Sequence, residues 1–440
     1  KEGGNASVSY FVGMEAMVLR VVQSLKDRNC NVTMRNAPLR LRYTECGAVT
    51  TTNVNTQFIF DHKDDMALWF DRAYVAREVE CYKASFEKHR EKTELYNGPI
   101  NIDGFGLPDF DPVYKSEAYN YTPAQNKLMV EFRGKIAGIH YSYIKSDETS
   151  FAVIAYPFPG IGKDFESIFN DTVKVNNLDN GLYQKIQQNI IDELDKGFAV
   201  HVTGRNGNET DVTVALTEIT DPEKQTVFEN CTADVNIPLG EVFTSPRLKG
   251  TNGLLHVKKV FLNGLEYRNL KVRFKDGVTT EVTCENFEEE SENKKFISEN
   301  LLFKHDFLPL GEFAIGTNTT AFVMGEKYGI QKKLPILIAE KTGPHFAIGD
   351  TCYSHAEDHK VYNPNGKEII SRTNDFAELR NTEPEKAYFN CHTDITIPND
   401  ELGDIISLRN DGKDFEIIKN GRFVVKGTEI LNDVLDKKGR

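Results

Sequence analysis

The chain of 440 residues lacks several features that would assign it to a protein class at once. It has no apolar run of about 18 residues, so the sequence predicts no membrane-spanning helix and no membrane partner. Acidic residues number 66 and basic residues 53, and the net charge of −13 argues against a nucleic-acid partner because it repels phosphate backbones. HExxH and GxSxG signatures are also missing, which excludes the commonest zinc-peptidase and serine-hydrolase motifs.

Cysteines are few and scattered, and no CxxC pair occurs. Their odd number disfavours a disulfide scaffold, and their spacing disfavours a zinc ribbon. Reduced thiols in a cytosolic protein are the simplest interpretation. The first residues, KEGGNASVSYF, also lack the basic and then apolar pattern of a secretory leader, so we expect a cytoplasmic location. The seven cysteines are Cys30, Cys46, Cys81, Cys231, Cys284, Cys352 and Cys391.

The first half of the chain mixes helical and extended patterns. Residues 8–22 carry apolar side chains at roughly helical spacing, and residues 66–93 form a long stretch without Gly or Pro that predicts helix. Residues 96–114 are rich in Gly, Pro and Asp and predict a long loop. An alternating run at 150–160 predicts a strand, and an i+4 apolar stripe within 182–197 predicts a helix.

Hairpin signals dominate the second half. Asn263-Gly264, Asp276-Gly277 and Asn420-Gly421 each stand between two extended runs, and such pairs tolerate the positive φ of two-residue turns. One acidic helix is expected within 285–302. The sequence therefore predicts an α/β N-terminal domain over 1–195 and an α+β, β-rich C-terminal domain over 196–440.

Four short segments of the second half place acids or imidazoles among apolar and small residues. They span 236–246, 308–319, 339–353 and 388–398. A carboxylate flanked by apolar residues is expected to be partly buried, which is costly unless it is paired or binds a metal. Together the segments supply five candidate ligands: Glu241, Glu312, His345, His392 and Asp394.

These residue types form a mixed oxygen and nitrogen donor set. His392 and Asp394 lie at i and i+2, so on a strand both side chains point to one face. Five such donors can hold two cations, a common device of hydrolases. Taken singly, a Gly-Glu pair is more often a solvated turn, and a lone His is more often a core residue. The residues alone leave both interpretations open.

Two of the segments reproduce longer motifs. Residues 238–246 match Pro-x-Gly-Glu-Val-Phe-Thr-x-Pro throughout, and residues 311–318 match Gly-Glu-Phe-Ala-x-Gly-x-Asn. His345 opens a His-x-Ala-x-Gly motif with Tyr353 downstream, and His392 opens a His-x-Asp motif. In these segments the chain resembles the aminopeptidase T and aminopeptidase S family, thermophilic leucyl aminopeptidases with two co-catalytic metal ions. The resemblance covers roughly residues 150–440 and is strong from about 230, whereas residues 1–150 look divergent.

The resemblance implies a function. The five candidate ligands would bind two divalent ions, Zn²⁺ first and Co²⁺ or Mn²⁺ as substitutes. Tyr353 would be a catalytic residue that stabilises the oxyanion, and Glu312 is the hypothesis for the proton-transferring carboxylate. The reaction implied is release of an N-terminal, leucine-like residue from short peptides, by a homodimer whose sites face an enclosed cavity.

Two alternatives remain at this stage. One is a metal-dependent amidase or carboxypeptidase with the same ligands, and the other is a non-catalytic peptide-binding relative. Metal content discriminates the second, since a binding module has no need of two ions. A competing group at residues 355–359, with His355 and His359 at i and i+4, is interpreted as a solvated turn because its context is polar and loop-like.

Overall fold

A computed structural model describes residues 1–36, 55–107, 110–232 and 236–436. The fold is mixed α/β with several sheets, as the sequence predicts. The chain divides into two compact units, Lys1–Ile161 and Gly162–Arg440, which are described separately below. Cys46 lies outside the described residues. Cys30, Cys81, Cys284 and Cys352 carry free thiols.

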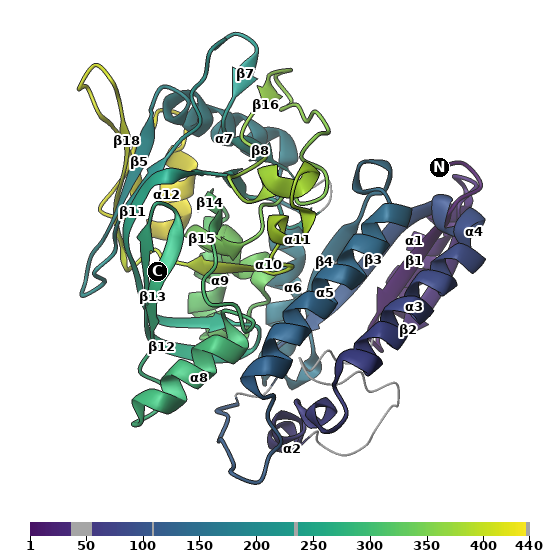
Figure 1. Ribbon diagram of the computed structural model, residues 1–440. Coiled ribbons are helices and arrows are strands. Elements are labelled where there is room, and N and C mark those ends of the chain that lie inside the picture. Colours follow the sequence, from purple (N-terminus) through teal and green to yellow (C-terminus); the bar gives the residue numbers. More distant parts are fainter. Residues whose placement is uncertain (37–54, 108–109, 233–235, 437–440) are drawn as a thin grey trace. The chain divides into compact units, whose positions relative to one another are not determined.

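The first unit is built on a parallel sheet with strand order β2-β1-β3-β4. Helices α3 and α5 lie side by side (Figure 1), and Phe70, Val75, Leu128 and Met129 form the core between them. The strands are β1 (Asn5–Tyr10), β2 (Asn31–Asn36), β3 (Tyr96–Phe105) and β4 (Ala152–Pro157). The helices are α1 (Glu15–Lys26), α2 (Thr56–Asp61), α3 (Arg72–Lys88), α4 (Arg90–Glu94) and α5 (Pro123–Tyr143).

Two predictions for this unit are corrected. The helix expected over 8–22 begins only at Glu15, because Ala6 and Val8 are buried at alternate positions of a strand. The loop expected over 96–114 opens with the ten-residue strand β3, which pairs with β1 on one side and β4 on the other. Gly98 is required there because a Cβ would lie 1.5 Å from the Ser150 carbonyl oxygen. The helical prediction over 66–93 and the strand within 150–160 are confirmed.

The second unit contains two large sheets. The site sheet, defined as β17-β15-β14-β10-β8, comprises β8 (Glu229–Cys231), β10 (Glu241–Thr244), β14 (Leu310–Gly316), β15 (Pro344–Gly349) and β17 (His392–Thr396). The eight-stranded sheet, in the order β13-β12-β11-β6-β5-β18-β19-β20, comprises β5 (Ala199–Gly204), β6 (Asp211–Ala215), β11 (Arg247–Leu262), β12 (Leu265–Lys275), β13 (Val278–Thr283), β18 (Leu402–Leu408), β19 (Phe415–Lys419) and β20 (Arg422–Phe423).

Helices and short strands complete this unit (Figure 1). The helices are α6 (Phe165–Asn176), α7 (Asn180–Leu194), α8 (Glu290–Asn300), α9 (Thr319–Tyr328), α10 (Ile336–Ala339), α11 (Pro384–Ala387) and α12 (Glu429–Asp436). The short strands are β7 (Gln225–Thr226), β9 (Asn236–Ile237) and β16 (Glu368–Ile369).

The three two-residue turns predicted from Asn-Gly and Asp-Gly pairs are confirmed. They join β11 to β12, β12 to β13 and β19 to β20. In each turn both central residues have positive φ, for example 53° at Asn263 and 79° at Gly264. That conformation matches the right-handed twist of the flanking strands.

The compact units divide earlier than the predicted boundary after residue 195. Helix α7, which the sequence assigns to the first domain, packs on β8 and β10 of the site sheet. Buried Gln187 donates to Asn230 Oδ1 at 2.7 Å and to the Cys231 carbonyl at 3.0 Å. Asp195, just beyond the helix, accepts hydrogen bonds from Thr226 Oγ1 and the Val227 amide. These polar contacts are specified by residues far away in the sequence, so composition alone does not reveal them.

Within the described residues, the helices are all too short or too polar to cross a membrane.

Candidate metal centre

The strand register of the site sheet brings the candidate ligands to one face. All neighbouring strands are antiparallel, and Glu312 on β14 stands opposite Ala347 on β15, which stands opposite Asp394 on β17. Directly opposed residues point to the same face of a sheet. Ala347 carries only a methyl group, so the two carboxylates on its flanks can approach each other.

The remaining ligands follow from the period of two along each strand. His345 lies two residues before Ala347, and His392 lies two residues before Asp394. Glu241 on β10 stands opposite Gly316, four residues after Glu312. Because alternate residues share a face, all five candidate ligands lie on the same side of the site sheet.

The side chains meet there in a chain of contacts. His345 Nε2 lies 3.4 Å from Glu241 Oε2, 3.3 Å from Glu312 Oε1 and 3.9 Å from Asp394 Oδ1. His392 Nε2 lies 3.2 Å from Glu312 Oε2 and 3.3 Å from Asp394 Oδ1. The two oxygens of Glu312 therefore face different imidazoles.

The cluster is buried at one end and open to solvent at the other. Glu241, Glu312, His345 and Asp394 are each no more than 6% exposed. The His392 side chain is 30% exposed, and Cys352 beside it is exposed as a residue. The cluster therefore meets solvent on the side of His392 and Cys352.

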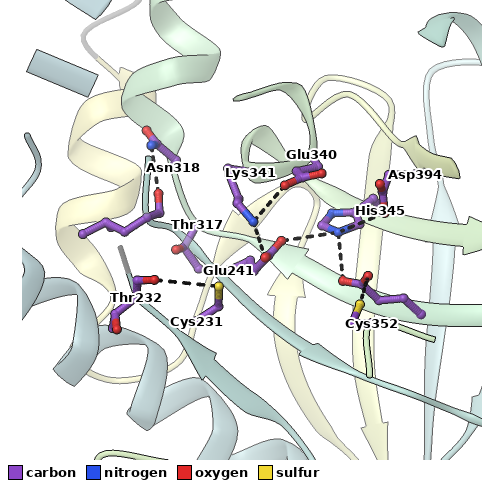
Figure 2. A network of polar contacts seen from close by, with 12 residues as sticks. Cys231, Thr232, Glu241, Thr317, Asn318, Glu340, Lys341, His345, Cys352 and Asp394 are labelled. Atoms are coloured by element: carbon purple, nitrogen blue, oxygen red, sulfur yellow. Dashed lines mark hydrogen bonds and ion pairs between the residues drawn. The ribbon is translucent and has the colours of Figure 1, made fainter. Parts of the chain in front are cut away.

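A buried ion pair adjoins the cluster and was missed by the sequence reasoning. The Lys341 ammonium donates to Glu241 Oε1 and lies 2.9 Å from Glu340 Oε1 (Figure 2). Both residues are buried, and Glu340 adds a fourth carboxylate to the three of the candidate ligands. The sequence signal was available, since Glu340 and Lys341 open the segment that contains His345, but a Glu-Lys pair is commonly exposed.

Excess buried negative charge shifts the protonation of the cluster. Burial alone would raise the pKa of Glu312, but hydrogen bonds and charge from His345 and His392 hold it well below the usual value. Burial would lower the pKa of His345, yet Glu312 and the other carboxylates raise it to about 10. The pKa of His392 is raised likewise, chiefly by Asp394. Four acids and a single lysine leave excess negative charge, which the two imidazoles offset by holding protons.

Backbone carbonyls orient the imidazoles. His392 Nδ1 donates to the Asp350 carbonyl at 2.7 Å, and this leaves Nε2 directed at Glu312 and Asp394. Asp350 is itself fixed, because its carboxylate accepts from the amides of Phe389 and Asn390. A carbonyl partner that fixes the ring and frees the opposite nitrogen is typical of metal-binding histidines.

The turn before Glu241 is held by Asn318, the last residue of the Gly-Glu-Phe-Ala-x-Gly-x-Asn motif. Gly240 has φ of 132°, and a Cβ there would lie 2.8 Å from the Cβ of Asn318. Asn318 donates to the Leu239 carbonyl and accepts from the Ala321 amide at the start of α9. The Gly-Glu and Gly-x-Asn parts of the two motifs therefore pack against each other and set the position of Glu241.

Tyr353, the predicted catalytic residue, makes its hydrogen bond to a residue outside the five candidate ligands. Its hydroxyl donates to Glu229, and its ring packs against Phe243 with 5.9 Å between centroids. The neighbouring Cys352 instead reaches the cluster, with Sγ 2.7 Å from Glu312 Oε2. The catalytic role of Tyr353 stays a prediction.

The competing group at 355–359 is partly engaged in other contacts. Asp358 pairs with Arg380, Glu357 accepts from the Tyr388 hydroxyl, and the His355 ring lies over Tyr388. In the described part of the chain, the groups whose donor atoms lie close enough to share a metal are Glu241 with Glu312 and His345, and Glu312 with Cys352 and His392.

The donor set fits a divalent cation. Glu241 Oε2 is buried and has no hydrogen-bond partner among the described residues, an arrangement that is costly without a cation. Imidazoles with carboxylates suit Zn²⁺ and its transition-metal neighbours better than Ca²⁺ or Mg²⁺.

A comparison with known families decides the class. The family model of thermophilic metalloproteases, M29, matches residues 119–423, well over half of the chain. The chain belongs to this family of metallopeptidases. It is therefore a peptide hydrolase that uses a divalent metal, as the resemblance implies. No curated protein matches the chain. The match includes all five candidate ligands, Glu340, Lys341 and Cys352.

Proposed function

We propose that this M29 metallopeptidase is an aminopeptidase that releases apolar, leucine-like N-terminal residues from short peptides. The observation that carries the proposal is the convergence of the five candidate ligands on one face of the site sheet, within contact distance of one another. We propose that these residues hold two divalent ions, with Zn²⁺ preferred and Co²⁺ or Mn²⁺ as substitutes. When bound, such ions supply Lewis acidity and make a water molecule acidic enough to act as a nucleophile near neutral pH.

Glu312 is central to this arrangement. Each of its oxygens contacts a different imidazole, which supports a carboxylate shared between two ions. Since both oxygens are engaged, its second predicted role, accepting the proton of the water, competes with metal binding. Glu340 Oε1 is the alternative acceptor, because it lies in the same buried group and is held by Lys341. The acceptor would then pass the proton to the leaving amine.

Recognition of the N-terminus follows from charge. The buried carboxylates can accept the positive α-amino group of a peptide, which a blocked N-terminus lacks. For Tyr353 to stabilise the oxyanion, its hydroxyl must exchange Glu229 for the substrate. We also propose that the protein is a homodimer whose sites face an enclosed cavity, as the family resemblance implies. Light scattering of the purified protein tests the dimer.

The test is hydrolysis of leucine-p-nitroanilide, compared with its N-acetylated form and with a C-terminally free, N-blocked peptide. We expect hydrolysis of the free substrate only, abolished by a chelator and restored by Zn²⁺, Co²⁺ or Mn²⁺. Cleavage of the blocked substrates would indicate an amidase or carboxypeptidase. Metal binding with no cleavage of any of the three would favour a non-catalytic peptide-binding relative.

Glu340→Gln and Glu312→Gln separate the two proton-transfer hypotheses. If Glu340 is the acceptor, its variant keeps the bound metal and loses kcat, whereas Glu312→Gln loses metal. If Glu340→Gln keeps both metal and kcat, Glu312 remains the candidate.

A further inference from the structure

Cys352 is placed by its loop at the solvent end of the cluster. It follows strand β15 by three residues and is exposed, whereas Tyr353 next to it turns into the core. The Cys352 thiol donates to Glu312 Oε2 at 2.7 Å. The same oxygen lies 3.2 Å from His392 Nε2. Figure 2 shows Cys352 beside the group that contains His345 and Glu241.

Two groups of metal-ligating atoms therefore share one carboxylate. Donor atoms of Glu241, Glu312 and His345 lie within 4.8 Å of one another, and so do those of Glu312, Cys352 and His392. The first group is buried throughout, and the second lies at the exposed end. Glu312 contributes Oε1 to contacts on the first side and Oε2 to contacts on the second.

We propose that Cys352 is a ligand of the outer metal ion, together with Glu312 and His392. This inference rests on the proposed two-metal function and adds a sulfur donor to the five candidate ligands. The thiol loses its proton to solvent when the metal binds, because the thiolate is the ligand form. Independently, Glu241 Oε2 is buried without a hydrogen bond and contacts His345 Nε2 at 3.4 Å, an arrangement that suits a cluster that binds a cation.

The sulfur donor has a consequence for metal selection. Thiolate ligands favour Zn²⁺, Co²⁺ and Cd²⁺ over Mn²⁺ and Mg²⁺, which prefer oxygen. The outer site is therefore thiophilic, and a thiol reagent should block it when it is empty. Bound metal should protect Cys352 from alkylation and leave exposed Cys81, on α3, unprotected.

The test is the absorption spectrum of the full-length protein loaded with Co²⁺. Visible ligand-field bands report cobalt bound to protein, and a near-ultraviolet charge-transfer band reports a cobalt–thiolate bond. We expect both in the wild type, and loss of the thiolate band in Cys352→Ser. Cys81→Ser is the matched control, and Cys391→Ser tests the other cysteine adjacent to His392. Both should retain the band.

Two further measurements make the assignment quantitative. Cys352→Ser should weaken Zn²⁺ binding at one of the two sites by at least roughly 10–100-fold, the effect of losing a residue that merely supports a ligand. Cys352→Asp, which restores an oxygen donor, should recover cobalt binding without the thiolate band. Mapping of alkylated peptides should show that Zn²⁺ slows labelling of Cys352 and not of Cys81. Circular dichroism of each variant shows that it is folded.

The outcomes separate this inference from the proposed function. Ligand-field bands without a thiolate band, or a thiolate band that survives Cys352→Ser, overturn the inference and leave the aminopeptidase proposal standing. A Cys352-dependent band in a protein that hydrolyses no peptide supports the inference and overturns the aminopeptidase proposal. Failure of the full-length protein to bind cobalt overturns both.

Discussion

The two large sheets of the second unit differ in the burial of their charged side chains. In the eight-stranded sheet, β12 alternates between buried and accessible positions, and its charged residues, such as Arg268 and Arg273, are exposed. In the site sheet, β14 and β15 are buried at every position, yet they carry Glu312 and His345. Charged side chains are exposed to solvent in β12 of the first sheet, whereas in the second sheet they are buried. Buried charged groups of this kind are typical of a functional site.

A network of buried polar groups lies beside the eight-stranded sheet and is held by hydrogen bonds between protein atoms. Asn208 donates to the His256 carbonyl and to Glu401 Oε2, and it accepts from the Thr210 amide. Glu401 Oε2 also accepts from the Lys258 amide. Buried atoms without a hydrogen bond occur in both sheets, and they include His256 Nε2 on β11 and Glu241 Oε2 on β10. Neither burial nor a single unsatisfied atom therefore marks a site. The site sheet differs because its carboxylates and imidazoles lie close enough together to share a metal ion.

The largest expected effect is on catalysis. Glu312→Ala removes the shared carboxylate and should lower kcat/KM by more than about 100-fold, beyond the range of residues that only support a ligand. Glu401→Gln, a matched change of a buried acid outside the site sheet, should leave kcat/KM within about twofold and reduce stability by about 1–3 kcal/mol. Steady-state kinetics and urea unfolding of both variants check this prediction. An equal loss of kcat/KM in the two variants would contradict it.

Metal removal should lower the local stability of the site sheet and leave that of the eight-stranded sheet unchanged. Without cations the cluster has four buried carboxylates that are balanced only by Lys341 and by protonated imidazoles, so the metal-free protein should be less stable. At metal concentrations of 100 to 1,000 times Kd, the gain on binding is about 3–4 kcal/mol. Hydrogen exchange should show faster exchange in β10, β14, β15 and β17 after chelation, with β11 and β12 unchanged. Uniform exchange across both sheets would contradict the localised centre.

Asp195, a partly buried acid outside both sheets, adds a pH-dependent test of the comparison. Burial raises the pKa of Asp195 to about 6, despite hydrogen bonds from Val227 and Thr226. The folded state then binds a proton more tightly than the unfolded state, so the stability this group contributes is present below about pH 4 and is lost as pH rises through 6. Relative to Asp195→Asn, wild-type stability should fall by about 2 kcal/mol between pH 4 and 7. Parallel pH profiles in urea unfolding would refute this.

The smallest expected effect concerns Tyr353. Because its hydroxyl donates to Glu229, Tyr353→Phe should cost about 1 kcal/mol of stability through the lost hydrogen bond. The kcat of Tyr353→Phe distinguishes a catalytic from a structural hydroxyl, since loss of a catalytic hydroxyl should lower kcat by roughly 100-fold or more. Tyr388→Phe, which removes the hydrogen bond to Glu357, is the control for a hydroxyl of purely structural role.

Local signals in the sequence predicted part of the structure well. The Asn-Gly and Asp-Gly turns and the apolar stripe of α7 depend on neighbouring residues alone. The sequence predicts a loop where strand β3 lies, because Gly, Pro and Asp residues normally break strands. Only pairing with β1 and β4 overrides that preference. The first compact unit ends at Ile161 rather than after residue 195 for a similar reason, since α7 is held by distant residues.

In the candidate site, too, local sequence predicts some residues, whereas packing between distant segments determines the others. The five candidate ligands stood out because charged groups lay in apolar segments, and the register then brought them to one face. Lys341 and Glu340 did not stand out, because their burial depends on packing that no local pattern specifies. Cys352 and Tyr353 are neighbours, and only the path of the loop after β15 determines which of them faces the cluster.

The most direct measurement is the metal content of the purified protein and of Glu241→Ala and His345→Ala, determined by mass spectrometry after dialysis against Zn²⁺. The account predicts close to two ions per wild-type chain, fewer in each variant, and leucine-p-nitroanilide hydrolysis that falls in step with the metal. Wild-type protein that binds no metal, or variants with unchanged metal content, would contradict the assignment of the buried cluster as the metal centre.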